Sequence, residues 1–278
     1  MRKGIMQGRL LPPIDGAIQR FPRDQWEKEF PLAVEAGVAS IEWIYEVYGA
    51  DSNPIGSDEG IKQIREISDR FNVTVGSLCA DYFMDKPFLR VAVTEREQRI
   101  EVLRWLIDRC GKLGINRVIL PFVDASKIDS SAERGEVVAI LEAVLTNAEA
   151  ARVELHLETS LPPAEFAELL ARVPHSYVKV NYDSGNSASL GYDAAEEFGA
   201  YADRIGSVHI KDRTRGGGTV PLGTGAADFD KLFRLLRRVG YDRGFVLQVA
   251  RGESGHEVAW ATQNRVLVEE LWANSVAT

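Results

Sequence analysis

Cysteine is scarce in this sequence, which has two among 278 residues, Cys79 and Cys110. Two thiols this far apart provide neither a disulfide framework nor the paired spacing of a structural zinc site. They are typical of a reducing compartment, and we expect a cytoplasmic protein. Long apolar runs are absent too, and the first residues, MRKGIMQGRLLPP, lack the apolar core of a signal peptide. We therefore expect no membrane partner.

Positive charge is also in short supply. The chain has 33 Lys and Arg against 41 Asp and Glu, a formal net charge of −8. Proteins that bind nucleic acids usually carry a basic surface, so we expect no nucleic-acid partner. Nucleotide motifs are missing as well: no G-x-G-x-x-G follows the first predicted strand, and the glycine-rich segment 214–225 lacks the P-loop pattern. That segment is either a flexible lid over an active site or an ordinary surface loop.

What the sequence does contain is a regular alternation of short β-like runs and longer helical runs. The predicted strands are 3–7, 39–45, 73–80, 117–122, 153–158, 177–183, 206–212 and 244–250, and the predicted helices are 23–37, 57–71, 94–114, 131–151, 162–173, 193–205, 227–240 and 257–275. Helical crossovers between strands favour a parallel sheet. Eight such units at this length predict an α/β fold, a (β/α)8 TIM barrel as a single domain over residues 1–278. An open doubly wound sheet is the alternative.

The last four predicted strands carry polar residues at every second position. The polar positions are Glu154, His156 and Glu158, then Lys179, Asn181 and Asp183, then Ser207, His209 and Lys211, and finally Gln248. Side chains of a barrel strand alternate between the interior and the surrounding helices. The other positions are largely apolar and suit the helix-facing side, so the polar positions are predicted to face into the barrel.

Four of these polar residues lie at or near the carboxyl ends of consecutive strands, where active sites of this fold lie. They are Glu158, Asp183, His209 and Gln248. Two carboxylates, an imidazole and an amide oxygen form a hard ligand set. The pattern predicts one divalent metal ion, Mn²⁺ or Mg²⁺ by preference, with Co²⁺, Fe²⁺ or Zn²⁺ tolerated. The alternative for any one of these residues is a hydrogen-bonded polar plug in the barrel.

Six segments spread over nearly the whole chain resemble the xylose-isomerase-like TIM barrels that act as sugar phosphate isomerases and epimerases. They are GIMQGRL (4–10), HLETS (156–160), NYDSGN (181–186), SVHIKDR (207–213), VPLGTGAADF (220–229) and FVLQVAR (245–251). The resemblance implies one metal ion held by Glu, Asp, His and Glu, at the positions of Glu158, Asp183, His209 and Gln248. It also implies proton transfer next to a carbonyl through an enediolate, with Glu158 as the base.

The sequence departs from the family pattern at two of these positions. Gln248 stands where the family has its second Glu, and Asn186 stands where the family tends to have His. In 3-epimerases the second Glu returns the proton to the opposite face, and a glutamine cannot do so. The alternatives are therefore a one-base isomerisation, a metal-dependent lyase acting on a keto-sugar, or a catalytically silent sugar-binding barrel. His156 is the candidate for the missing catalytic group, and Lys211 and His256 are further candidates.

Other polar residues near the predicted barrel mouth are candidates for binding a small carbohydrate substrate. They are Gln7, Glu42, Asn186, Lys211, Arg215 and Arg251. Arg215 or the nearby Arg213 corresponds to a family arginine that contacts substrate, and Arg251 could bind a phosphate or carboxylate. Asp81 also lies near the mouth. The amphipathic segment 94–114 and the five tryptophans are compatible with a homo-oligomer. The four histidines are too few for a three-metal endonuclease of the endonuclease IV type.

Overall fold

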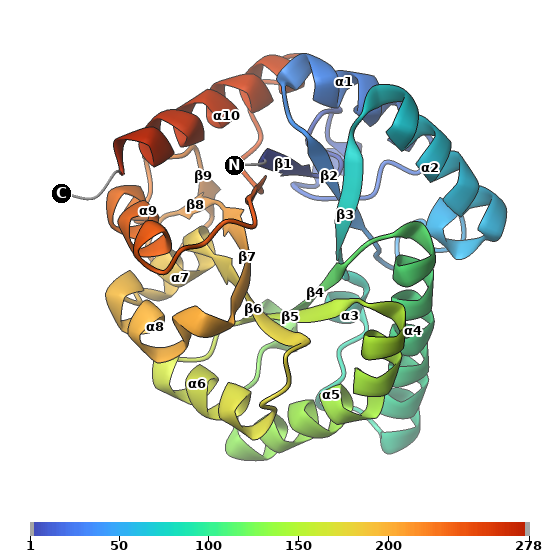
Figure 1. Ribbon diagram of the computed structural model, residues 1–278, viewed down its shortest axis with the longest axis vertical. Helices are drawn as coiled ribbons and strands as arrows, with labels where there is room; N and C mark the ends of the chain where they lie inside the picture. Colours follow the sequence, from blue (N-terminus) through green and yellow to red (C-terminus); the bar gives the residue numbers. More distant parts are fainter. Residues whose placement is uncertain (1–2, 276–278) are drawn as a thin grey trace.

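Eight parallel strands close into a barrel in the computed structural model, which describes residues 3–275. The strands are β1 (Lys3–Met6), β2 (Ser40–Ile44), β3 (Thr74–Cys79), β4 (Arg117–Phe122), β5 (Glu154–Thr159), β6 (Val178–Asp183), β7 (Ile205–Ile210) and β10 (Phe245–Leu247). Their order around the ring is β1-β10-β7-β6-β5-β4-β3-β2, so each strand pairs with its neighbour in sequence (Figure 1). The predicted TIM barrel is confirmed.

Helices surround the barrel on all sides (Figure 1). The longer ones are α1 (Glu29–Ala36), α2 (Asp58–Phe71), α4 (Val93–Leu113), α5 (Ser131–Ala151), α6 (Pro163–Arg172), α8 (Ala194–Tyr201), α9 (Phe229–Arg238) and α10 (Glu257–Asn274). Two short helices, α3 (Tyr82–Asp85) and α7 (Ser184–Leu190), follow β3 and β6. Among the described residues, no helix combines the length and the apolarity that crossing a membrane requires.

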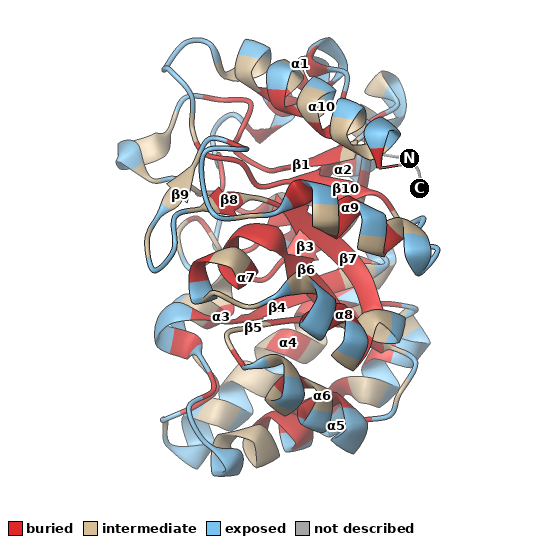
Figure 2. Cartoon of the chain, turned by 90° about the vertical axis from the view of Figure 1, so that its left-hand side faces the viewer, coloured by how far each residue is buried: buried red, intermediate tan, exposed pale blue. Residues whose placement is uncertain are grey.

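The sequence pattern of each helix explains which face it buries. In α9, Phe229, Leu232, Phe233 and Leu236 recur at helical spacing and are all buried, whereas the other face carries charged residues. Figure 2 shows the same division, with the strands buried and the outer faces of the helices exposed. The helices therefore turn their apolar faces toward the strands, and the buried hydrophobic side chains form one connected core.

The first helix was predicted over residues 23–37 and is shorter in the structure. A 3-10 turn spans Trp26–Lys28, and α1 begins only at Glu29. Pro31 lies in the first turn of α1, where the backbone nitrogen needs no intrahelical partner. The predicted end is confirmed, since Gly37 adopts the left-handed conformation (φ 70°) that closes the helix.

The glycine-rich segment after β7 is anchored at both ends. Asp212–Arg213 (β8) pairs antiparallel with Thr219–Val220 (β9). The Asp212 carboxylate then accepts hydrogen bonds from the backbone N–H groups of Gly223, Gly225 and Ala227, at 2.9, 2.9 and 3.1 Å. One buried carboxylate thus fixes the return path of a segment for which the sequence predicted a flexible lid or a plain loop.

Candidate active site

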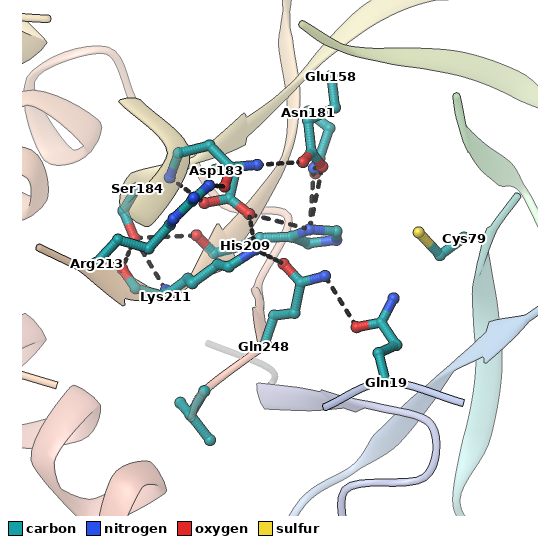
Figure 3. Close-up of polar contacts among 12 residues, drawn as sticks. Gln19, Cys79, Glu158, Asn181, Asp183, Ser184, His209, Lys211, Arg213 and Gln248 are labelled. Carbon is teal, nitrogen blue, oxygen red and sulfur yellow. Dashed lines mark hydrogen bonds and ion pairs between the residues drawn. The ribbon is translucent and has the colours of Figure 1, made fainter. Parts of the chain in front are cut away.

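Three predicted metal ligands meet at the carboxyl ends of β5, β6 and β7. Glu158, Asp183 and His209 are all buried, and each offers one ligand atom within 4.8 Å of the others. His209 Nδ1 lies 3.4 Å from Glu158 Oε2 and 4.0 Å from Asp183 Oδ2 (Figure 3). Spacings of this size are compatible with one small cation between the three side chains, because metal–ligand bonds of about 2 Å subtend such distances.

Glu42, in the middle of β2, fixes the orientation of His209 from across the barrel interior. Its Oε1 lies 2.6 Å from His209 Nε2, which directs Nδ1 toward Glu158 and Asp183. Carboxylates commonly orient metal-binding histidines in this way. Burial lowers the pKa of His209, but Glu42 and Glu158 outweigh it and raise that pKa to about 10. The surrounding carboxylates therefore favour a positive charge here, carried by a proton or by a metal ion.

Asp183 leaves one carboxylate oxygen available. Its Oδ1 accepts a hydrogen bond from the backbone N–H of Asn186 at 2.7 Å and so caps α7. Its Oδ2 is buried without a hydrogen-bond partner and has Lys211 Nζ at 3.5 Å. A buried acceptor without a partner costs about 1–3 kcal/mol. A metal ion would satisfy this oxygen, so the residues present fit the ion that the family implies.

Glu158 is held by two asparagine side chains. Asn181 donates to Oε2 at 2.7 Å, and Asn186 donates to Oε1 at 2.6 Å. Burial acts to raise the pKa of Glu158, but His209 and Lys211 outweigh it, and the pKa is lowered. Glu158 is therefore an oriented carboxylate, as a general base requires.

Gln248 lies one residue beyond the end of β10 and joins this cluster through Lys211. Its amide oxygen accepts from Lys211 Nζ at 3.3 Å, and its amide nitrogen donates to Gln19 Oε1 at 3.0 Å. Lys211 is also the cation nearest to the free oxygen of Asp183. Gln248 thus lies beside Glu158, Asp183 and His209, and the role of each of the four as a metal ligand remains a prediction.

A cavity of about 270 Å³ opens over these residues at the barrel mouth. Its lining includes Arg9, Gln19, Cys79, Asp81, Glu158, Asn186, Lys211, Arg213 and Gln248. Glu158, Asn186, Lys211 and Gln248 are predicted site residues, so the structure brings these four to one open space. The volume is close to the lower end of ligand sites that hold small metabolites.

His156 lies one level deeper in the barrel than the cavity. Its Nδ1 is 2.7 Å from Ser207 Oγ, and its Nε2 is 2.9 Å from Glu154 Oε2. Burial lowers the pKa of His156 to about 4, so the ring is neutral. Both ring nitrogens are engaged, and the side chain does not line the cavity. This position gives no support to the catalytic role predicted for His156.

The predicted arginines lie elsewhere. Arg215 donates to the carbonyl of Gly191 and lines a separate depression of about 140 Å³ beside α7 and α8. Arg251 donates to the carbonyls of Ile18 and Leu11, at 3.0 and 2.8 Å, and lines another hollow. Neither lines the mouth cavity.

Arg213, and not Arg215, lies at the predicted substrate-binding position in the mouth cavity. It lines the cavity and donates to Asn186 Oδ1 at 2.8 Å, while Asn186 in turn contacts Glu158. Gln7 is buried in the barrel, where its Oε1 accepts from the N–H of Ile44 at 2.9 Å. Gln7 and Glu42 thus do not line the cavity, and Glu42 acts on the site through His209.

Sequence reasoning gave no role to two residues of the segment after β1. Arg9 lies in the quoted GIMQGRL motif, so the sequence held a signal for it, whereas Gln19 follows an irregular stretch with no periodicity. Gln19 Nε2 donates to Asp81 Oδ2 at 2.6 Å and its oxygen receives Gln248. These contacts of Gln19 depend on how the segment after β1 crosses the barrel mouth, which no periodicity in the sequence indicates.

With this geometry established, comparisons with known proteins identify the family. The sequence model described as "Xylose isomerase-like TIM barrel" matches residues 30–269. The chain belongs to this family. In Haemophilus influenzae, the protein named "Putative L-ribulose-5-phosphate 3-epimerase SgbU" is 26% identical over 193 residues, which are 64% of this chain and 66% of that protein.

Two further proteins are similar. The "2-epi-5-epi-valiolone 7-phosphate 2-epimerase" of an Actinoplanes strain is 27% identical over 63% of this chain and 64% of its own length. Both sequence matches thus span slightly less than two thirds of the relative. Among solved structures, the IOLI protein with a bound zinc atom superposes with a TM-score of 0.78 and 17% identity, covering 100% of both chains. At that identity the superposition shows a shared fold.

Proposed function

We propose that this protein is a divalent-metal-dependent isomerase or epimerase of a sugar or sugar phosphate. The observation that carries the proposal is the ligand set of Glu158, Asp183 and His209, in which one buried oxygen of Asp183 lacks a hydrogen-bond partner. The names of the two sequence relatives, a "Putative L-ribulose-5-phosphate 3-epimerase SgbU" and a "2-epi-5-epi-valiolone 7-phosphate 2-epimerase", support the same class of reaction.

The chemistry follows from what surrounds Glu158. Asn181 and Asn186 hold its carboxylate in one orientation, and its lowered pKa keeps it ionised. From there it removes a proton from the carbon next to the substrate carbonyl. A metal ion, when bound by Glu158, Asp183 and His209, would supply Lewis-acid polarisation of the substrate's oxygens. Mn²⁺ or Mg²⁺ suits this oxygen-rich set.

Positive side chains at the rim stabilise the negative charge that develops. Lys211 and Arg213 line the cavity on the side of β7 and β8. Arg213 is bonded to Asn186, and Lys211 to Gln248, so both are held in place before substrate arrives. Preorganised donors of this kind stabilise an enediolate without having to reorient during the reaction.

Metal binding and proton exchange together test the proposal. The purified protein, stripped and then titrated with Mn²⁺, Mg²⁺, Co²⁺, Fe²⁺ and Zn²⁺, is expected to bind one equivalent of metal. In D₂O with a panel of ketoses and ketose phosphates, NMR should show deuterium entering the carbon next to the carbonyl. An Asp183→Asn variant should lose both. Absence of metal binding and of exchange in the wild type would falsify the proposal, and a dehydrated product would indicate the lyase instead.

A further inference from the structure

The family's second carboxylate is replaced by the amide of Gln248, so the proposed reaction lacks a second acid–base group at the end of β10. Gln248 donates its amide hydrogen to Gln19, and Gln19 donates in turn to Asp81 Oδ2 at 2.6 Å. Figure 3 shows Gln19 reaching to Gln248, and Cys79 turning its sulfur toward the same space. The two glutamines thus connect the site of the missing carboxylate to an existing one.

Asp81 lies at the carboxyl end of β3, just before α3, and lines the mouth cavity together with Glu158. Its Oδ1 accepts from Cys79 Sγ at 3.1 Å and its Oδ2 accepts from Gln19. These two contacts fix the carboxyl group in a part-buried position. Asp81 and Glu158 are therefore two fixed carboxyl groups on different strands facing one space.

The surroundings of Asp81 favour the protonated form of its carboxyl group. Burial, followed by the charges of Glu158 and Glu42, raises the pKa of Asp81. A carboxyl group with a raised pKa is suited to donate a proton as a general acid. Asp81 has the character of the acid.

We propose that Asp81 is the second acid–base residue of this site and returns a proton to the substrate carbon that Glu158 deprotonates. This inference rests on the proposed function. It places the two carboxyl groups on opposite faces of the substrate and so assigns the chain to stereochemical inversion, an epimerisation. Asp81, two residues after β3, thereby takes the part that Gln248, one residue after β10, cannot fill, because an amide does not act as an acid near neutral pH.

The proton steps balance without another reactant. Glu158 takes the proton, the electron pair of the C–H bond forms the C=C bond of the enediolate, and the carbonyl oxygen takes the negative charge. Asp81 then gives its proton to the opposite face of the same carbon. The C=C pair forms the new C–H bond, and the carbonyl is restored. Glu158 loses its proton to water and Asp81 regains one from water, which resets the site.

Two other groups at the mouth are less suited to this step. Lys211 contacts Asp183 and Gln248, on the same side as the metal ligands, where its charge stabilises an anion. Glu46 also lines the cavity, and burial raises its pKa to about 7, but its Oε1 is bonded to the backbone N–H of Phe21 at 2.5 Å.

An Asp81→Asn variant tests the proposal on the metal-loaded protein, with the best substrate of the ketose panel in D₂O. We expect epimer formation to fall by about 100-fold or more, because an amide cannot donate the proton. Deuterium should still enter the recovered substrate, since Glu158 exchanges its proton with solvent and returns it to the same face. That exchange also shows that the variant is folded.

A double variant supplies the positive test. Adding Gln248→Glu to Asp81→Asn restores the family's second carboxylate, and we expect epimer formation to recover by at least 10-fold. Asp69→Asn, which makes the same charge change at an exposed position on α2 outside the cavity, serves as the matched control and should behave like the wild type.

Three results would overturn the assignment. Asp81→Asn could epimerise at the wild-type rate, or it could lose exchange and epimerisation together, or a Lys211→Met variant could show the split between them instead. In each case wild-type exchange would leave the proposed function standing. If the wild type exchanges no proton with any substrate, both proposals fail.

Discussion

Polar side chains inside the barrel form two levels that differ in how completely they are hydrogen-bonded. At the lower level, His156 has Ser207 on one ring nitrogen and Glu154 on the other. At the upper level, Asp183 Oδ2 and Glu42 Oε2 are buried without a hydrogen-bond partner. A completed polar layer stabilises the barrel, whereas buried acceptors left without partners mark a place built for a ligand. Burial alone does not distinguish the two levels, but their hydrogen bonding does.

The largest expected effect comes from removing the upper-level base. Glu158→Gln should reduce deuterium uptake into substrate by as much as about 10⁴-fold, because general-base catalysis contributes that much. Glu154→Gln is the matched control, since Glu154 lies on the same strand and faces the same way but at the lower level. Unchanged deuterium uptake in Glu158→Gln would show that the upper level is no more catalytic than the lower level.

The carboxyl group of Glu29 is also buried with one oxygen that lacks a partner, but here a proton rather than a metal ion makes its burial tolerable. Its Oε1 accepts from the N–H of Gly8 at 2.6 Å, its Oε2 has no hydrogen-bond partner, and burial raises its pKa to about 8. The protonated form is favoured on folding, so the stabilisation is complete below pH 4.5 and is lost as the pH rises toward 8. The shift corresponds to about 4–5 kcal/mol.

Glu29→Gln should therefore flatten the pH dependence of unfolding between about pH 4.5 and 8. Urea unfolding at several pH values measures this directly. The variant should be more stable than the wild type above pH 8, where the wild type buries a charge. An equal loss of stability with pH in both proteins would contradict the protonated state of Glu29.

A variant of Glu42 tests whether metal binding depends on the orientation of His209 as well as on the presence of His209 itself. Glu42→Gln keeps a group beside His209 Nε2 but removes the carboxylate charge. We expect metal binding to weaken by about 10- to 100-fold, as with other residues that orient ligands. Isothermal titration with Mn²⁺ checks this, and unaltered affinity would show that His209 needs no such support.

The smallest effect is expected at the lower level. Ser207→Ala removes the hydroxyl between His156 and Asn181, with which it makes contacts of 2.7 and 2.6 Å. The free energy of unfolding should fall by about 1–2 kcal/mol, because buried polar groups lose a partner. Metal affinity should change by less than about threefold. A loss of metal binding as large as in Glu42→Gln would mean that the two levels act as one.

Much of the site was predictable because it follows from two regular patterns in the sequence, the alternation of side chains along a strand and the repeated β–α unit. Strand alternation identified the inward side of β5, β6 and β7, and the repeated β–α unit placed Glu158, Asp183 and His209 at neighbouring strand ends. The remainder depended on individual contacts. Arg213 rather than Arg215 reaches the cavity because the β8–β9 pairing sets the direction of that segment, and no periodicity encodes such a choice.

The barrel and the convergence of Glu158, Asp183 and His209 could be read from the sequence, since both follow from local repetition that each element carries in its own residues. Which polar atoms find partners depended on the packed fold. It paired both nitrogens of His156, left Asp183 Oδ2 open, and brought Gln19 between Gln248 and Asp81. The physical reason is that hydrogen bonds between residues distant in sequence depend on positions to within a few tenths of an ångström, which only the packed barrel fixes.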